Sequence, residues 1–366
     1  MIRFLTLCML AIYSNVSIAQ SSVLKKDSIL KQMKLVASWQ IKEFDAGNVK
    51  IPKTNWENGA FYAGLMALVK VNNDGLYTGF LRGIGESNRW DMGKNRLFAD
   101  DYCVAQMYTQ LYMKYKEPKM IAKWVALADT IVGHQFNEPL KVAPNINLRE
   151  WAWCDALFMG PPALAYLSTA KKDLKYLKKA DSLWWKTSAY LYDKTVHLYY
   201  RDSRFFDSKE KNGKPVFWSR GNGWVMGGLV RMMDNMPRNF PSRKKYESQF
   251  MEMAEKVAAL QQADGSWHAS LLDPETYTEK ETSGTGFFCY AMTWGVRNGL
   301  LPKDKYMPVI EKAWIALTSA VHPDGKLGYV QKVGDQPGTA GYESTNVYGV
   351  GAFLLAGSEL YQLIKK

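Results

Sequence analysis

Apolar and polar positions follow a helical period along nearly the whole chain. Some segments are apolar on almost every side, which is typical of helices buried inside a fold. These all-apolar segments lie at 61–68, 104–112, 156–167, 225–233, 287–294 and 348–360. Amphipathic segments with a Lys- and Glu-bearing face alternate with them, at 27–44, 118–131, 174–192, 246–262 and 306–320, with a weaker example at 80–88. The pattern predicts inner helices that alternate with outer, half-exposed helices.

Glycines recur inside or beside the predicted inner helices, among them Gly64, Gly160, Gly228 and Gly351. A glycine within a helix costs roughly 1 kcal/mol relative to alanine, so its repeated use there predicts close approach of neighbouring inner helices. Strand signals are few, and we expect only short strands at 198–200 and 328–331. The predicted fold class is therefore all-α with small β additions.

A polar motif that contains Gly or Trp, or a pair of acids, opens each inner segment. The motifs are Asn-Trp-Glu-Asn-Gly at 55–59, Ala-Asp-Asp-Tyr at 99–102, Trp-Ala-Trp-Cys-Asp at 151–155, Trp-Ser-Arg-Gly-Asn-Gly-Trp at 218–224, Glu-Thr-Ser-Gly-Thr-Gly at 281–286 and Glu-Ser-Thr-Asn at 343–346. They recur every 43 to 67 residues, a spacing that suits a hairpin of two helices. Six hairpins closed into a ring form an (α/α)6 barrel with short β-hairpins at its rim. Such a ring gathers all six motifs around one pocket, an arrangement typical of carbohydrate chemistry.

The first twenty residues are expected to be a signal peptide rather than part of the barrel. Arg3 is followed by an apolar run at 4–12 and by a small-x-small cleavage signal at 17–19. We therefore predict a signal peptide at 1–20 and a single barrel domain at 21–366. Export to the periplasm is favoured, with secretion as the alternative, and no later segment is expected to span a membrane.

Charge and cysteine usage exclude several kinds of partner. The net charge of +12 is spread over Lys-bearing outer segments, and its field would attract an anionic sugar acid. Aromatic residues are not interleaved with the Lys runs, so nucleic-acid binding is not expected. Cys103, Cys154 and Cys289 lie in apolar stretches and are predicted to be buried thiols. The four His are scattered, so neither a metal nor a cofactor is predicted.

Asp155 is the sharpest catalytic candidate. It lies between Trp153 and an apolar run, where a dry environment would raise the pKa of its carboxyl and make it a proton donor. The alternative is that Asp155 caps the helix that follows, and the two roles are compatible. Of the pair Asp100 and Asp101, one can cap a helix while the other points into the ring, and Asp101 is the expected inward carboxylate.

A third candidate constellation is basic and aromatic. Arg220 offers a planar fork for a carboxylate, and Trp218 and Trp224 offer flat faces for a sugar ring. Arg201 is a second candidate cation, with a surface ion pair to Asp202 or Asp207 as the alternative. The predicted substrate-binding set is completed by Trp56, Trp151, Trp153, Asn222 and Trp267.

These motifs resemble the unsaturated uronyl hydrolases of glycoside hydrolase family 105 and, more distantly, family 88. The resemblance covers nearly the whole chain after residue 20, and Trp-x-Arg-Gly-Asn-x-Trp and Trp-x-Asp-x-Leu-Phe-Met are its most specific parts. It implies removal of a 4,5-unsaturated uronic acid from the non-reducing end of an oligosaccharide left by a polysaccharide lyase. Asp155 would protonate C4 and activate the water that adds at C5, and Asp101 would be the second pocket carboxylate.

The resemblance also carries departures that bear on the substrate. Family members have a basic residue shortly before the catalytic Asp, matched here by Arg149, and a His where this chain has Arg201. An unsaturated galacturonyl-rhamnose from rhamnogalacturonan is the favoured substrate, with a glucuronyl substrate from ulvan or arabinogalactan as the alternative. A sugar epimerase or a lyase on the same barrel, a non-catalytic glycan-binding protein and a structural helical repeat remain competing hypotheses.

Overall fold

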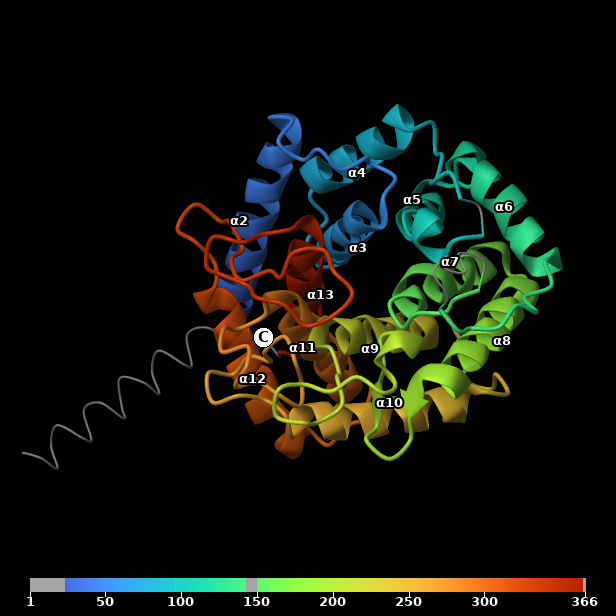
Figure 1. Ribbon diagram of the computed structural model, residues 1–366. Coiled ribbons are helices and arrows are strands. Elements are labelled where there is room, and N and C mark those ends of the chain that lie inside the picture. The colour runs from blue at the N-terminus through green and yellow to red at the C-terminus, as the bar shows by residue number, and fades with distance from the viewer. Residues whose placement is uncertain (1–23, 96, 143–149, 365–366) are drawn as a thin grey trace, which may run out of the picture.

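The computed structural model describes residues 24–95, 97–142 and 150–364, and in that part of the chain twelve α-helices form a double ring (Figure 1). The inner helices are α3 (Trp56–Val71), α5 (Ala105–Tyr115), α7 (Ala156–Lys171), α9 (Ser219–Asp234), α11 (Thr282–Arg297) and α13 (Val347–Leu363). The outer helices are α2 (Lys26–Asp45), α4 (Gly75–Ser87), α6 (Ala122–Gly133), α8 (Leu174–Leu191), α10 (Arg243–Ala258) and α12 (Lys303–Ser319). Short 3-10 turns lie at η1 (Ala99–Tyr102), η2 (Pro118–Met120) and η3 (Ser203–Phe205). The signal peptide predicted at 1–20 and the candidate Arg149 lie outside the described residues.

The inner helices close on themselves. Each packs on the next, from α3 through α5, α7, α9 and α11 to α13, and α13 packs again on α3. The outer helices cover this ring, with α4 on α3, α8 on α7, α10 on α9 and α12 on α11. The predicted all-α (α/α)6 barrel is therefore confirmed, including the weak outer segment at 80–88, which belongs to α4.

Glycines allow the inner helices to approach closely, as predicted. A Cβ atom added to Gly64 on α3 would lie 2.3 Å from the carbonyl oxygen of Gly351 on α13. On α9, a Cβ atom added to Gly228 would lie 2.3 Å from the carbonyl oxygen of Leu157 on α7. Such contacts bring helix backbones together at points where any side chain would force them apart.

The β additions are confirmed in part. Strand β1 (Tyr192–Asp193) pairs antiparallel with β2 (Leu198–Tyr199), as expected for the segment at 198–200. The strand predicted at 328–331 is wrong. Tyr329 there has a left-handed φ of 55°, and its N–H donates to the carbonyl of Gly341 in a loop instead of to a neighbouring strand.

Two further expectations concern the interior and the membrane. Cys103, Cys154 and Cys289 are buried free thiols, as predicted. Burial raises the pKa of the Cys289 thiol to about 12 and that of Cys154 well above its usual value. Within the described ranges, every helix is too short or too polar to cross a lipid bilayer.

Candidate functional site

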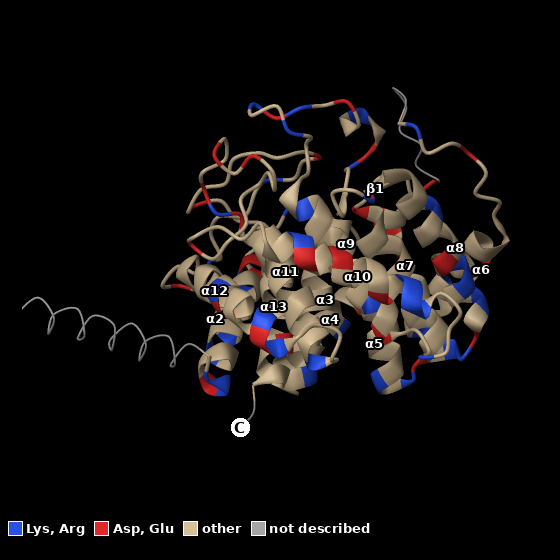
Figure 2. Ribbon diagram, turned by 90° about the horizontal axis from the view of Figure 1, so that it is seen from below, with Lys and Arg blue, Asp and Glu red and all other residues tan. Residues whose placement is uncertain are grey.

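The long connections of the barrel gather at one end of the ring. Figure 2 shows these loops on the side away from the end of α13. The inner helices begin at this loop end (Figure 2), and each polar motif lies at or just before the start of one of them. The candidate site is built where the segments before α5, α7 and α9 meet the hairpin β1–β2.

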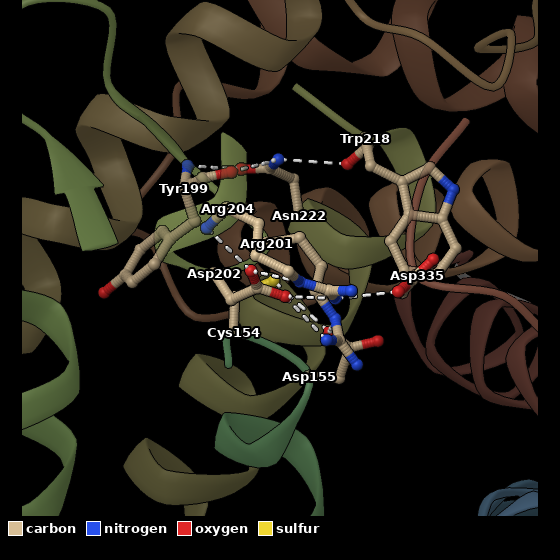
Figure 3. Close-up of polar contacts among 9 residues, drawn as sticks. All are labelled: Cys154, Asp155, Tyr199, Arg201, Asp202, Arg204, Trp218, Asn222 and Asp335. Atoms are coloured by element: carbon tan, nitrogen blue, oxygen red, sulfur yellow. Dashed lines mark hydrogen bonds and ion pairs between the residues drawn. The ribbon is translucent and has the colours of Figure 1, made fainter. Parts of the chain in front are cut away.

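Asp155 lies at the N-cap position of α7, but its side chain makes no capping hydrogen bond. The residue is 9% exposed, and its Oδ2 lies 3.3 Å from Nε of Arg201 and 3.5 Å from Sγ of Cys154 (Figure 3). Trp153, two residues before Asp155, packs against Phe98 with ring centroids 5.1 Å apart. The carboxyl therefore faces the guanidinium of Arg201 and the buried thiol of Cys154. The capping alternative does not account for this orientation.

Arg201 is held in place by the hairpin that precedes it. Its backbone carbonyl accepts a hydrogen bond of 2.8 Å from the N–H of Cys154, which fixes it beside Asp155. Its Nη1 donates to Oδ2 of Asp202 at 2.7 Å. The ion pair with Asp202 that was the alternative for Arg201 exists, but the same side chain also contacts Asp155, so both interpretations hold together.

Asp202 is fully buried and connects two arginines. It accepts hydrogen bonds from Nη1 of Arg201 and from Nε and Nη2 of Arg204. Burial alone would raise the pKa of Asp202, but the hydrogen bonds from Arg204 and Arg201 outweigh it and lower the pKa. Nη2 of Arg204 also donates to Asp335 at 2.7 Å, and Figure 3 shows this chain of charges running from Asp155 to Asp335.

The second carboxyl near Asp155 is Asp100, whereas the sequence suggested Asp101. Burial, followed by the charge of Asp155, raises the pKa of Asp100 well above its usual value. Oδ1 of Asp100 is buried without a hydrogen-bond partner among the described residues. Asp101 instead accepts a hydrogen bond from the backbone N–H of Asn95 and packs against Gly93. Asp101 is therefore directed to the 93–95 loop, and Asp100 is the carboxyl that faces Asp155.

Glu57 is a further acidic residue that sequence reasoning did not single out. It lies in the first turn of α3, is 8% exposed, and burial raises its pKa. Its charge is close enough to contribute to the raised pKa of Asp100. The sequence signal was present, because Glu57 and Asp100 both belong to motifs that open inner segments.

Arg220 does not present its fork to the pocket, contrary to prediction. The guanidinium is fully buried between the rings of Trp218 and Tyr348, at 4.4 Å and 4.8 Å from their centroids. Its Nη1 and Nη2 donate to the backbone carbonyls of Gln331 and Lys332 at 2.8 Å and 2.9 Å. Arg220 therefore anchors the loop before α13 through Nη1 and Nη2, and burial encloses the guanidinium between two rings.

Asn222 is also a structural residue. It accepts a hydrogen bond from the N–H of Tyr199 and donates to the carbonyls of Tyr199 and Trp218. The residue is fully buried. It joins the start of α9 to the strand that leads into Arg201, and so acts on the site through position alone.

The tryptophans predicted to line the pocket differ in their exposure to solvent. Trp151, Trp153, Trp218, Trp224 and Trp267 are all buried. Trp224 packs against Phe287 in the core, and Nε1 of Trp267 donates to the carbonyl of Val257. Trp56 is half-buried and stacks on Tyr348 at 5.4 Å. The prediction of a sugar-stacking face is wrong for Trp224 and Trp267, because both are enclosed by the core, and Trp56 retains a partly accessible ring.

Among residues 24–95, 97–142 and 150–364, the structure contains no group of three His, Cys, Asp or Glu side chains placed to hold a metal ion. The site has the chemistry of acids and cations: two carboxyls, one of them with a raised pKa, and a guanidinium between Asp155 and Asp202. This set can move a proton and can bind an anionic group.

Comparison with known proteins agrees with this chemistry. The model for Glycosyl Hydrolase Family 88 matches residues 32–364. An unsaturated 3S-rhamnoglycuronyl hydrolase from Formosa agariphila is 38% identical over 320 residues, which cover 85% of each chain. A solved glycosyl hydrolase of family 88 from Bacteroides vulgatus superposes with a TM-score of 0.83 at 30% identity, over 93% of this chain and all of that one. A structure described as polysaccharide lyase BACCELL_00875 superposes with a TM-score of 0.82 at 32% identity, over 92% of this chain and 97% of that one. The resemblance to families 105 and 88 noted from the sequence motifs is confirmed, and the chain belongs to glycosyl hydrolase family 88.

Proposed function

We propose that this glycoside hydrolase removes a 4,5-unsaturated uronic acid from the non-reducing end of oligosaccharides by hydrating the C4=C5 double bond. The observation that carries the proposal is Asp155, a buried carboxyl at a helix start that makes no capping bond and faces Arg201. The name of the Formosa agariphila relative supports the same substrate class. Because such double bonds arise by β-elimination from a uronic acid, the enzyme acts on the products of a polysaccharide lyase.

The reaction needs one group that first gives and then takes a proton. The Asp155 carboxyl donates its proton to C4, and the positive charge that develops at C5 is shared with the ring oxygen. Water then adds at C5 and gives its proton to the Asp155 carboxylate, which restores the acid. The C5 hemiketal opens to a ketone, and the hemiacetal formed at C1 collapses to an aldehyde and releases the next sugar as an alcohol. One water is consumed, and no ordinary displacement at C1 is required.

Asp100 and Arg201 are the two ionisable neighbours that can assist Asp155 in this proton transfer. In the free enzyme, Arg201 pairs with Asp155, while burial and the charge of Asp155 raise the pKa of Asp100 well above its usual value. A substrate carboxylate that binds Arg201 would share this guanidinium with Asp155. Asp100 is the neighbouring carboxyl that can assist the proton transfer from Asp155.

The sugar next to the uronate decides specificity. Formation of the C4=C5 double bond removes the stereocentres at C4 and C5, so galacturonate and glucuronate give the same unsaturated residue. Discrimination must then rest on the glycosidic linkage and on the neighbouring sugar. We propose rhamnose as that neighbour, because the substrate favoured by the family resemblance contains it and the name of the relative includes it. We also propose that the protein is exported, with the periplasm as its site of action.

The test is the ultraviolet absorbance of the conjugated uronate in lyase digests of rhamnogalacturonan and of ulvan. Wild type should lower the absorbance, and Asp155→Asn should reduce kcat by roughly 10²–10⁴-fold while remaining folded. Asp173→Asn is a matched control, because Asp173 caps α8 with a hydrogen bond to the N–H of Lys175 and lies far from the site. Loss of activity in both variants, or in neither, would contradict the proposed role of Asp155.

A polysaccharide lyase is the second candidate, because one similar structure carries that description at 32% identity. The direction of the absorbance change in the same assay distinguishes the two functions. A lyase creates the conjugated double bond and raises the absorbance of an intact polysaccharide, whereas the proposed hydrolase lowers the absorbance of a digest. If absorbance rises when the enzyme is added to undigested polymer, the proposed hydrolase function is wrong and the lyase function takes its place.

A further inference from the structure

At the edge of the site, Arg204 forms an exposed ion pair that the proposed reaction does not use. Its Nη2 lies 2.7 Å from Oδ2 of Asp335, and the two side chains are 43% and 41% exposed. Arg204 belongs to η3, three residues after Arg201, whereas Asp335 belongs to the loop between α12 and α13 (Figure 3). Segments far apart in the sequence are thus joined beside the catalytic carboxyl by one pair of charges.

The buried Asp202 fixes the orientation of Arg204. Nε and Nη2 of Arg204 donate to the two oxygens of Asp202 at 2.9 Å and 2.7 Å. Because Asp202 also binds Arg201, the guanidinium of Arg204 is connected to Asp155 through one carboxylate and one arginine. Arg204 is therefore an ordered cation that is connected to Asp155, and it is not a loose surface side chain.

The loop that carries Asp335 is anchored at both ends. The carbonyls of Gln331 and Lys332 are held by Arg220, and Oε1 of Gln331 accepts a hydrogen bond from Nε1 of Trp218. Nε2 of Gln331 donates to the carbonyl of Gln336 at 2.8 Å, which closes the loop on itself. Asp335 is thus presented to Arg204 by a constrained backbone, and a change of partner requires only a side-chain rotation.

The pair between Arg204 and Asp335 is easy to exchange. Ion pairs with this exposure contribute little to stability, because water screens the charges and two side chains lose freedom. An anionic group on a ligand offers Nη2 of Arg204 a charged oxygen acceptor of the same kind as Oδ2 of Asp335, while the contacts of Arg204 with Asp202 are kept. It can therefore replace Asp335 without a large loss of free energy.

We propose that Arg204 binds a sulfate or carboxylate substituent on the sugar released by the reaction, and that Asp335 occupies this place in the free enzyme. The inference rests on the proposed function, because it assigns a specificity residue to the same site. It places an anion-binding subsite beyond Arg201, on the aglycone side. The enzyme would accordingly prefer oligosaccharides whose neighbouring sugar is charged.

The experiment compares kcat/KM for three unsaturated substrates. One carries a sulfate on the sugar next to the uronate, the second is the same compound after desulfation, and the third carries a carboxylate there. Asp335→Asn removes the internal competitor and should raise the ratio of charged to uncharged substrate by up to about five-fold at low salt, the factor that corresponds to about 1 kcal/mol. Arg204→Gln should lower the same ratio by roughly ten-fold or more, because a charge-assisted contact is lost. Glu255→Gln, which removes an equally short exposed pair with Lys305 on the outer helices, should leave the ratio unchanged.

The direction in which each variant changes the ratio of kcat/KM for charged to uncharged substrate tests the inference. If Asp335→Asn lowers the ratio, Asp335 orients Arg204 instead of competing for it, and the proposal is wrong. If neither variant changes the ratio while wild type is active, the subsite does not exist, although the proposed reaction stands. If wild type fails to lower the absorbance of any of the three substrates, the proposed function falls and the inference falls with it. A response to the sulfated compound alone, or to both charged compounds, identifies which anion Arg204 accepts.

Discussion

Replacement of Asn222 by alanine should damage both the fold and the reaction, although Asn222 touches neither Asp155 nor Arg201 through a hydrogen bond. Its side chain accepts from the N–H of Tyr199 at 2.8 Å and donates to the carbonyl of Tyr199 at 3.1 Å. A third bond of 3.0 Å goes to the carbonyl of Trp218. Alanine would leave both backbone groups of Tyr199 without this partner in a buried environment.

The expected loss of stability follows from the number of backbone groups that lose a hydrogen bond. A buried polar group left unsatisfied costs about 1–3 kcal/mol, and the carbonyl of Trp218 keeps its helical partner, the N–H of Asn222. With two groups of Tyr199 affected, the free energy of unfolding should fall by about 2–6 kcal/mol. Tyr199 lies two residues before Arg201, so a shift of this strand also displaces the guanidinium. Because misplacement of a catalytic group by about 1 Å can cost 10²-fold, kcat should fall by roughly that factor.

The assay pairs urea unfolding with the absorbance assay for unsaturated uronates. Asn298→Ala is the control, because Asn298 is an asparagine at the end of an inner helix, α11, whose Nδ2 donates to the carbonyl of Trp294 at 2.9 Å. The control should lose no more than about 1.5 kcal/mol and should keep its kcat. If Asn222→Ala unfolds at the same urea concentration as Asn298→Ala, or keeps the wild-type kcat, the idea that this clamp positions Arg201 is refuted.

Two further predictions concern burial and packing. The folded state binds a proton at Asp100 that the unfolded state releases from about pH 4 upward, so this residue lowers stability as pH rises. Asp100→Asn should therefore raise the melting temperature at neutral pH, with a gain that shrinks as the pH is lowered toward 4; a gain independent of pH would contradict the raised pKa. Gly64→Ala should lower the free energy of unfolding by about 1–3 kcal/mol, because its Cβ would lie 2.3 Å from the backbone oxygen of Gly351. Gly79→Ala on the outer α4, where the new Cβ meets nothing within 4 Å, should be neutral or stabilising, and equal effects of the two changes would contradict the packing argument.

The fold could be predicted because the barrel imposes two different environments on its helices. An inner helix is enclosed by neighbours on all sides, so it is apolar all round, while an outer helix keeps one charged face. The limits of α4 were harder to see. Its sequence contains Gly75, Gly79, Gly83 and Gly85, which weaken helix propensity, and tertiary packing of Tyr77 and Leu81 stabilises the helix despite them. The strand expected at 328–331 failed for a related reason: alternation of residue types does not reveal whether a partner strand exists.

The residue types of the candidate site could be predicted from the sequence, but the directions in which their side chains point could be predicted less well. Arg220 and Trp224 lie four residues apart on α9, so they share one face of that helix. That face packs against Tyr348 of α13 and is covered by the loop at 331–332, which the sequence pattern does not place. A cation between two tryptophans was a sound indicator of a ring-stacked guanidinium. The partner is a pair of backbone carbonyls, however, and only the tertiary structure supplies that information.

Asp100 and Asp101 illustrate the same limit at the scale of one residue. They belong to the 3-10 turn η1, in which successive side chains point about 120° apart, so one member of the pair faces Asp155 and the other must face away. Which one does so depends on the phase of the turn, and this phase is set by the 93–95 loop, where the backbone of Asn95 binds Asp101. That contact leaves Asp100, whose Oδ1 is buried, as the carboxyl that shares the environment of Asp155. The second carboxyl of the proposed site is therefore selected by a loop that carries no catalytic group.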